Sequence, residues 1–316
     1  MLENFMYSIN ATMPIFLVMI LGWWLKRIGF LTDEFVSVAD KLVFKVALPV
    51  LVFKDIAGAD LSNDFDLKFV LFCFLGTCVF FGVTWLFAEI FLKDKSMIGS
   101  FVQGAFRGSA AILGIAFAQN IYGDSGLVPM MIVASIPLFN IFSVLVLVRS
   151  ANANENDRKA VMKKTLKGIV TNPIIIGIVL GIPFALLKFE FPVILQKSIN
   201  SVASLSTPLA LLAIGGAFST GEAMKRIRLT MIASVIKLVV IPGVFLPLAI
   251  WMGFRGEALV AMLILTGAPT TVSSYIMAKN MGNDDALASG IVVMTTLLSS
   301  VTLTTIIFLL KNGGYI

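Results

Sequence analysis

Two stretches of the sequence decide the fold: SFVQGAFRGSAAILGIAFAQNIYG at residues 100–123 and LVAMLILTGAPTTVSSYIMAKNMG at residues 259–282. Each begins and ends as an apolar helix would, but each has glycine, serine, threonine or proline at its centre. Proline removes a backbone donor and obstructs the preceding turn, and glycine lowers the free energy needed to unwind a helix. Both stretches are therefore predicted to be helices that are interrupted in the middle.

The composition of the whole chain is that of an integral membrane protein. Of its 316 residues, 58% are hydrophobic and 13% are charged, and the mean hydropathy is +0.97. A soluble domain carries about 25% charged residues. Apolar runs of roughly 20 residues, the length that spans a bilayer, recur from end to end. We expect an all-α integral membrane protein without a sizeable soluble domain.

The absence of histidine excludes several classes of chemistry. Ser-His and Cys-His catalysis both need an imidazole, and most zinc sites use one. We therefore expect no enzyme activity, no cofactor and no metal site. The net charge of +6 comes from basic residues in the short loops between spans. The sequence shows no surface that combines aromatic and basic residues, as nucleic-acid-binding proteins have. The charge is interpreted as a topology signal and not as a site for nucleic acid.

Charge clusters and Gly, Asn and Asp residues divide the chain into ten predicted spans. They cover residues 7–25, 35–56, 69–91, 99–121, 126–149, 167–187, 193–217, 229–251, 257–280 and 285–310. The first run lacks a basic leader and a cleavage site, so we expect a retained span and not a signal peptide. The predicted organisation is a five-helix repeat at 1–150, a polar linker at 151–166 and a second repeat at 167–316.

A shift of 159 residues aligns landmarks of the two halves without gaps. The matched pairs include Pro14 with Pro173, Gly22 with Gly181, Pro49 with Pro208 and Gly108 with Gly267. Coincidence could explain the apolar matches, but proline and glycine matches at one offset favour duplication. Because each half holds an odd number of spans, the second half is inserted in inverted orientation, as is common in secondary transporters.

Lysine and arginine are concentrated in the loops that follow the odd-numbered spans, from Lys26 and Arg27 through the linker to Lys279. By the positive-inside rule, both termini face outward and the linker is cytoplasmic. We expect a multi-pass protein of the plasma or inner membrane.

The interruptions in spans four and nine fall at positions that the repeat matches. Simple kinks, or close packing through small residues, are the alternative for either span alone. Paired broken helices in corresponding places are the best sequence pointer to a transporter's binding site. Two half-helix N-termini, with Ser109 and Thr270 or Thr271 as N-caps, would present positive dipole ends and free N–H groups to one cavity. That arrangement favours an anion.

Arg107 stands at the first interruption, about two helical turns from the cytoplasmic end of its span. Its guanidinium stays charged at bilayer depth, which costs several kcal/mol unless something pairs with it. A substrate carboxylate is the predicted partner. The alternative is a structural arginine bonded to helix-end carbonyls or to a nearby acid. The predicted substrate-binding residues are Arg107, Gly108, Ser109, Ala268, Pro269, Thr270, Thr271, Ser273 and Asn140.

Other polar residues inside the spans are candidates for ion coupling or for the transport path: Lys45, Lys237, Asp40 and Gln103. Asp40 and its neighbour Lys41 lie near a helix end, where both side chains can instead reach the membrane surface. Lys45 and Lys237 lie deeper, and each could pair with an acid, line the aqueous path or lose its proton. Asn120 and Ser274 are further candidates that could equally join helices.

The motifs AFRGSAAILGIAFAQNIYG (105–123), TGAPTTVSSYIMAKNMGNDDALASGIVVMTTLLSSVTL (266–303) and ALPVLVF (47–53) resemble the auxin efflux carrier family, particularly its bacterial members. The resemblance covers essentially the whole chain. It implies the fold of bile-acid symporters and sodium/proton antiporters, in which spans four and nine cross, and it implies a homodimer. It also implies small carboxylate substrates, indole acetate in plants and malonate, malate or similar acids in bacteria. Ser109 and Ala116 depart from the asparagine and proline that the family often has there.

These observations predict a secondary transporter of small organic anions that works by alternating access. Spans three to five and eight to ten would move against spans one, two, six and seven. The alternatives are a sodium-coupled carrier of the bile-acid type, with sodium held by unwound carbonyls and hydroxyls, and an anion channel. The expected partners are a small organic anion and the lipid bilayer.

Overall fold

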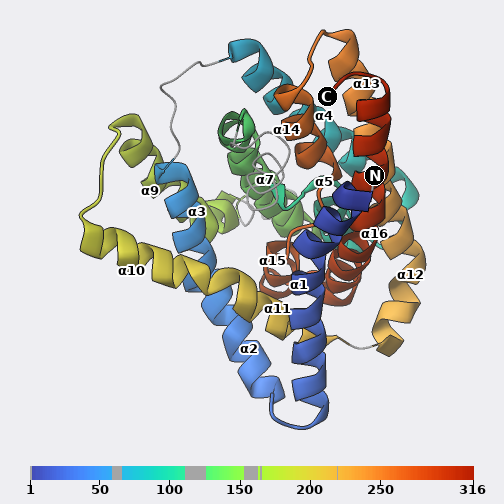
Figure 1. The fold of residues 1–316 in the computed structure, drawn as a ribbon. Coiled ribbons are helices and arrows are strands. Elements are labelled where there is room, and N and C mark those ends of the chain that lie inside the picture. Colours follow the sequence, from blue (N-terminus) through green and yellow to red (C-terminus); the bar gives the residue numbers. More distant parts are fainter. Residues whose placement is uncertain (1, 59–65, 111–125, 153–162, 164–165, 219) are drawn as a thin grey trace.

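The computed structural model describes residues 2–58, 66–110, 126–152, 163, 166–218 and 220–316. Within these ranges all regular secondary structure is helical (Figure 1). The elements in chain order are α1 (Leu2–Arg27), α2 (Asp33–Leu42), the π-helical turn η1 (Val43–Ala47), α3 (Leu48–Ala57), α4 (Leu67–Phe91), the 3₁₀ turn η2 (Lys95–Met97), α5 (Ile98–Phe106), α7 (Val128–Ala151), α9 (Pro173–Leu186), α10 (Val193–Ser204), α11 (Ser206–Ala217), α12 (Thr220–Val235), the π-helical turn η3 (Ile236–Val240), α13 (Ile241–Trp251), α14 (Glu257–Gly267), α15 (Ser273–Asn280) and α16 (Asp285–Asn312).

Five of the ten predicted spans coincide with helices that are long and apolar enough to cross a membrane. These are Leu67–Phe91, Val128–Ala151, Val193–Ala217, Met224–Trp251 and Asp285–Asn312. The other predicted ranges also contain helix, including the shorter apolar helices Pro173–Leu186 and Glu257–Gly267. The all-helical expectation is confirmed, whereas the count of ten crossings and the inverted repeat stay predictions.

Acidic side chains from the loops begin two of the long apolar helices. Asp66 Oδ1 accepts the N–H of Phe69 at the start of α4, at 3.0 Å. Asp284 Oδ1 accepts the N–H of Leu287 at the start of α16, at 2.8 Å. Each such N-cap satisfies a backbone donor that the helix leaves free and stabilises the helix by about 1 kcal/mol. The caps therefore fix where these apolar runs leave the loops.

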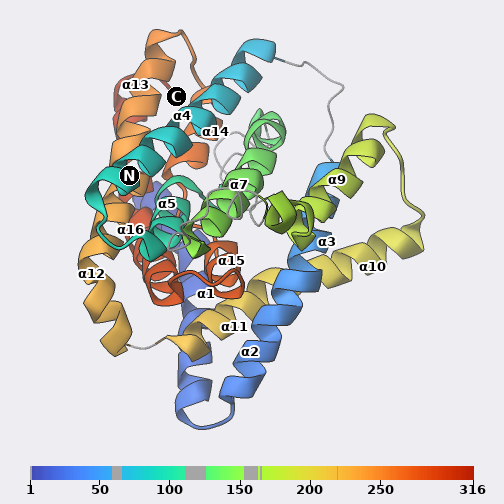
Figure 2. The same cartoon turned by 180° about the vertical axis from the view of Figure 1, so that it is seen from behind.

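The helices form two groups that pack mainly within themselves (Figures 1 and 2). In the first group α1 packs along α11, α2 packs on α11, and α3 packs along α9 and α10. In the second group α4, α5 and α7 pack together, α12 packs on α16, and α13 packs on α14. Between the groups, α1 lies against α16, and α15 contacts α2, η1 and α11.

The first group is held by backbone contacts at glycines. A Cβ at Gly22 of α1 would overlap the carbonyl group of Leu212 in α11, and one at Gly215 of α11 would overlap the backbone of α1. A Cβ at Gly181 of α9 would lie 2.9 Å from the Cβ of Ile56 in α3. Because only glycine fits these contacts, each of the two helix pairs approaches as closely as its backbones allow.

Aromatic rings join the helices of the second group. The rings of Phe81 in α4 and Phe142 in α7 stack with centroids 4.3 Å apart. Phe72 of α4 stacks on Phe245 of α13 with centroids 4.5 Å apart. Such pairs contribute about 0.5–1.5 kcal/mol beyond the area they bury. α4 is thereby fixed to both α7 and α13.

Candidate functional site

Both predicted helix interruptions are present in the described residues. α5 ends at Phe106, and the backbone at Arg107 is extended, with φ −87° and ψ 130°. α14 ends at Gly267, and α15 begins only at Ser273. The continuation of span four beyond residue 110, with the candidate Asn120, lies outside the described residues.

The two interruptions are bonded to each other. The N–H of Ser109 donates to the carbonyl oxygen of Pro269 at 2.8 Å. Thr270 Oγ1 donates to the carbonyl oxygen of Gly104, near the end of α5, at 2.6 Å. The N–H of Thr270 donates to Thr295 Oγ1 at 3.0 Å. These bonds satisfy backbone groups that the broken helices can no longer pair internally.

The prediction that Thr270 or Thr271 caps the second half-helix is wrong. The N-cap of α15 is Val272, and no side chain caps this end. The Thr270 hydroxyl bonds to the end of α5 instead, because a buried helix-end carbonyl without a partner costs about 1–3 kcal/mol. Thr271 Oγ1 lies 3.2 Å from Ser273 Oγ. The expectation that the amides of Ser109 and Thr270 are free for a ligand is corrected too, since both already donate to protein atoms.

Arg107 is buried, with 7% of its surface exposed, and its guanidinium bonds only to neutral groups among the described residues. Nη2 donates to Asn140 Oδ1 at 3.0 Å. Nη1 donates to Ser143 Oγ at 3.3 Å and to Met277 Sδ at 3.0 Å. No carboxylate of the described residues lies within ion-pair distance of it. Arg107 and Asn140, both candidates from the sequence, are therefore in contact, and no described residue supplies a counter-charge to the guanidinium.

Met277, Gln103 and Ser143 complete the surroundings of the guanidinium. Gln103 Nε2 donates to Met277 Sδ at 3.4 Å, and Gln103 Oε1 is buried without a partner. The hydroxyl of Ser274, on the same half-helix as Met277, is also buried without a partner. Sequence reasoning missed Met277 and Ser143. Met277 was missed because an apolar side chain does not stand out in a membrane span. Ser143 could have been found, because it lies three residues from Asn140 and therefore on the same helix face.

Lys237 has a structural partner. Its side chain is fully buried on η3, and Nζ donates to the carbonyl oxygens of Thr266 at 2.7 Å and Leu265 at 3.4 Å. These carbonyls belong to the last turn of α14, where a cation is favourable. A Cβ at Gly108 would lie 2.9 Å from Nζ and 3.2 Å from the carbonyl oxygen of Ala268, so a larger residue there would displace the Lys237 side chain. No acid of the described residues pairs with Lys237.

Asp40 is 1% exposed and does not reach the surface, contrary to the alternative considered for it. Its Oδ2 lies 2.6 Å from Lys279 Nζ and accepts from the Tyr275 hydroxyl at 3.5 Å. Asn280 Nδ2 donates to the Asp40 carbonyl oxygen at 3.4 Å. Among the ion pairs of the described residues, this one alone joins the two helix groups. Sequence reasoning missed it because Lys279 was counted with the loop charges.

Lys45 does not join this site. Its side chain is exposed on η1, as is that of Lys41 one turn earlier. Neither lysine has an ion pair within the described part of the chain. The structure thus separates the deeper candidates that the sequence grouped together, since Lys237 is buried at the interruptions and Lys45 is not.

Comparison with known proteins places the chain among transporters. Residues 7–307 match the membrane transport protein family. A protein of Rhizobium meliloti named "Putative malonate transporter" is 24% identical over 310 residues, which cover 96% of each chain. An uncharacterized transporter of Methanocaldococcus jannaschii is 21% identical, over 93% of this chain and 96% of that protein. The uncharacterized transporter YfdV of Escherichia coli K12 is 23% identical, over 86% of this chain and 88% of that protein.

Proposed function

Because the chain belongs to the membrane transport protein family, that of the auxin efflux carriers, we propose that it is a secondary transporter of small organic anions. Members of this family are multi-pass membrane proteins that move solutes and are not enzymes. The substrate is a small mono- or dicarboxylate such as malonate, malate or an auxin-like acid, and it moves by alternating access. The name of the Rhizobium meliloti relative supports this substrate class.

The unbalanced charge of Arg107 carries the proposal. A guanidinium fork matches the two oxygens of a carboxylate, and such charge-assisted bonds are about twice as strong as neutral ones. One of its donors points at Met277 Sδ, a weak acceptor that a carboxylate oxygen can replace. Asn140 and Ser143 hold the guanidinium in place without neutralising it. A bound carboxylate supplies the missing charge.

The proposed architecture has ten spans in two inverted repeats, with spans four and nine crossing where the interruptions meet. Two glycines that the repeat matches support it. Gly22 brings α1, in span one, against α11, in span seven. Gly181 brings α9, in span six, against α3, in span two. Spans one and six, and spans two and seven, are the pairs that the repeat relates, so matched residues make matched contacts.

The two helix groups are the proposed moving parts. The first group holds spans one, two, six and seven, and the second holds spans three to five and eight to ten. Glycine contacts bind the first group internally and aromatic stacks bind the second. The Asp40–Lys279 pair connects them, so it must open when the groups move past each other.

The proposed topology places both termini outside and the linker in the cytoplasm, with the chain assembled as a homodimer. A cysteine at Asn152, near the start of the linker, tests the topology. In a chain lacking Cys73 and Cys78, an impermeant thiol reagent should leave intact cells unlabelled and label opened membranes. Labelling in intact cells would reverse the assignment.

The function is tested by thermal unfolding of the purified protein with a panel of mono- and dicarboxylates. A ligand of the folded state raises the unfolding midpoint. We expect malonate or a related acid to raise it in the wild type and in Arg228→Ala, which removes an exposed arginine, but not in Arg107→Ala. A panel without any stabilising acid would reject carboxylate transport. Uptake that requires sodium would favour the bile-acid type of carrier.

A further inference from the structure

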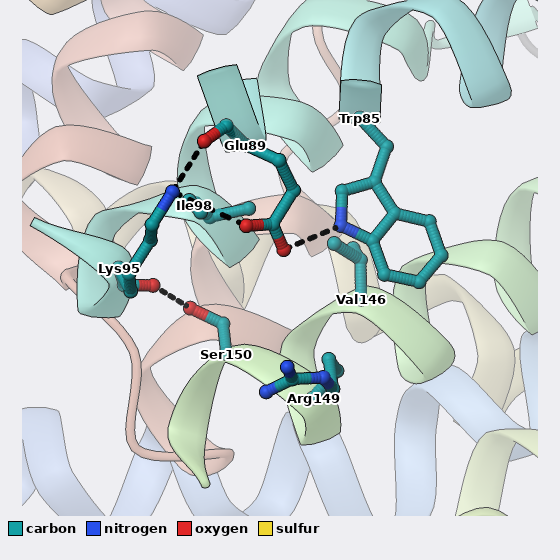
Figure 3. A pocket seen from close by; sticks show the side chains of 7 residues that line it. All are labelled: Trp85, Glu89, Lys95, Ile98, Val146, Arg149 and Ser150. Carbon is teal, nitrogen blue, oxygen red and sulfur yellow. Dashed lines mark hydrogen bonds and ion pairs between the residues drawn. The ribbon is translucent and has the colours of Figure 1, made fainter. Parts of the chain in front are cut away.

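A polar cavity lies where α4 and α7 end and α5 begins (Figure 3). Its volume is about 120 Å³, well above the roughly 10–15 Å³ that one water molecule needs. The walls come from Trp85 and Glu89 of α4, Lys95 of η2, and Arg149 and Ser150 of α7, with two apolar residues. None of these residues belongs to the proposed carboxylate site.

The acid and the lysine in this pocket neutralise each other. Glu89 Oε2 lies 3.2 Å from Lys95 Nζ, and Glu89 Oε1 accepts from Trp85 Nε1 at 3.3 Å. Lys95 Nζ also donates to the Glu89 carbonyl oxygen, and Ser150 Oγ donates to that of Lys95 at 2.8 Å. The bonds drawn in Figure 3 thus fix four side chains around the cavity.

Arg149 adds a positive charge that no described residue balances. It stands in the last turn of α7, and its guanidinium lies beside Ser150 at the edge of the pocket (Figure 3). The side chain is exposed and has no hydrogen bond or ion pair within the described parts of the chain. With Glu89 and Lys95 paired, the pocket carries one net positive charge, which favours an anion.

The exposed face of α4 carries a stripe of apolar side chains that extends to the end of the helix at which the pocket lies. Val79, Val83, Leu86 and Ile90 are spaced three or four residues apart and are 58%, 62%, 62% and 65% exposed. In a membrane transport protein such a face contacts acyl chains. The last residue of the stripe, Ile90, directly follows Glu89 of the pocket, and the pocket also contains Trp85, a residue type enriched at the level of lipid headgroups. The pocket therefore lies where acyl chains give way to headgroups.

We propose that the pocket binds the phosphate of an anionic phospholipid, with the acyl chains along the α4 stripe. Arg149 supplies the planar fork that matches two phosphate oxygens and the one positive charge of the pocket that Glu89 does not neutralise. A soluble phosphate offers the same anionic group, but it makes no use of the apolar stripe.

Such a lipid would hold both helices that position Arg107. α5 begins at the pocket and ends directly before Arg107. α7 ends at the pocket and carries Asn140 and Ser143, which bind the guanidinium. A phosphate between the start of α5 and the end of α7 therefore stabilises the helix pair that orients the arginine.

The test measures thermal unfolding of the full-length protein in neutral detergent, without any carboxylate. Four additions are compared: short-chain phosphatidylglycerol, phosphatidylcholine of the same chain length, glycerol phosphate and inorganic phosphate. Arg149→Gln is compared with Arg149→Lys and with Lys93→Gln, which removes an exposed charge next to the pocket. Because no transport substrate is present, the outcome does not depend on the proposed function.

We expect phosphatidylglycerol to raise the unfolding midpoint of the wild type and of Lys93→Gln by several degrees. Arg149→Lys should keep part of the rise and Arg149→Gln should lose it, while phosphatidylcholine and the soluble phosphates have no effect. A rise with soluble phosphate that Arg149→Gln removes would assign the pocket to a soluble phosphate and overturn the lipid. Equal rises in Arg149→Gln and in the wild type would overturn the site itself.

Discussion

Two buried cations lie near the contact between the broken helices, and their partners differ. Lys237 donates to the last carbonyl groups of α14, and Arg107 donates to an amide, a hydroxyl and a thioether. A helix C-terminus carries roughly half a negative charge, which partly balances an ammonium. Neutral side chains offer dipoles but no such charge. The end of α14 thus partly balances the charge of Lys237, whereas the described neighbours of Arg107 carry no charge that could balance it.

Burial alone therefore does not distinguish the two cations. Both residues are almost inaccessible, and sequence reasoning treated both as candidates. The two residues differ in whether the groups that they contact balance their positive charge. By the same criterion Asp40 and Lys279, which balance each other, belong to the connection between the helix groups and not to the substrate site.

The largest effect is expected at Arg107. Arg107→Ala should abolish saturable carboxylate uptake into proteoliposomes, because it removes the proposed counter-charge. Arg107→Lys should also lose most of the uptake, since an ammonium cannot form the two parallel bonds of a guanidinium. Both variants should purify as folded protein. Normal uptake by Arg107→Ala would make Arg107 a structural residue like Lys237.

A smaller effect, on stability, is expected from the pair between the helix groups. Lys279→Met leaves the Asp40 carboxylate buried and uncompensated, and should lower the free energy of unfolding by about 3–5 kcal/mol. Asp40→Asn should cost less, because Lys279 is partly exposed and can turn to water. Denaturant titration of the two single variants and of the double variant checks this order. A double variant whose loss of stability equals the sum of the two single losses would show that the pair is not coupled.

Lys237→Met should lower the free energy of unfolding by about 1–3 kcal/mol, because the last carbonyl groups of α14 lose their donor. Carboxylate binding should remain, since the proposed role of Lys237 is to cap α14. Thermal unfolding with and without the stabilising acid gives both quantities. Loss of binding in a folded Lys237→Met would move the anion site toward this lysine.

The smallest effect is expected at Lys45. Its side chain is exposed on η1 and has no ion pair in the described structure. Lys45→Met should therefore leave both uptake and stability nearly unchanged, within about 0.5 kcal/mol. A large loss of uptake would return Lys45 to the transport path.

The helix interruptions could be predicted because proline and glycine act through the local backbone. Pro269 and Gly267 disturb a helix whatever surrounds them. The bonding of Thr270 could not be predicted, since its acceptor is the carbonyl of Gly104, far away in sequence. The same holds for Asp40 and Lys279, which are brought together only by the packing of α15 on α2. The sequence therefore indicated the candidate residues, but their hydrogen-bond and ion-pair partners depend on tertiary contacts.

Isothermal titration of one stabilising carboxylate into wild type, Arg107→Ala and Lys237→Met tests the central claim most directly. Arg107 is proposed to carry the charge that the substrate balances, and Lys237 is proposed to be balanced by α14. The prediction is saturable binding with similar affinity in the wild type and Lys237→Met, and none in Arg107→Ala. Unchanged affinity in a folded Arg107→Ala would contradict the claim.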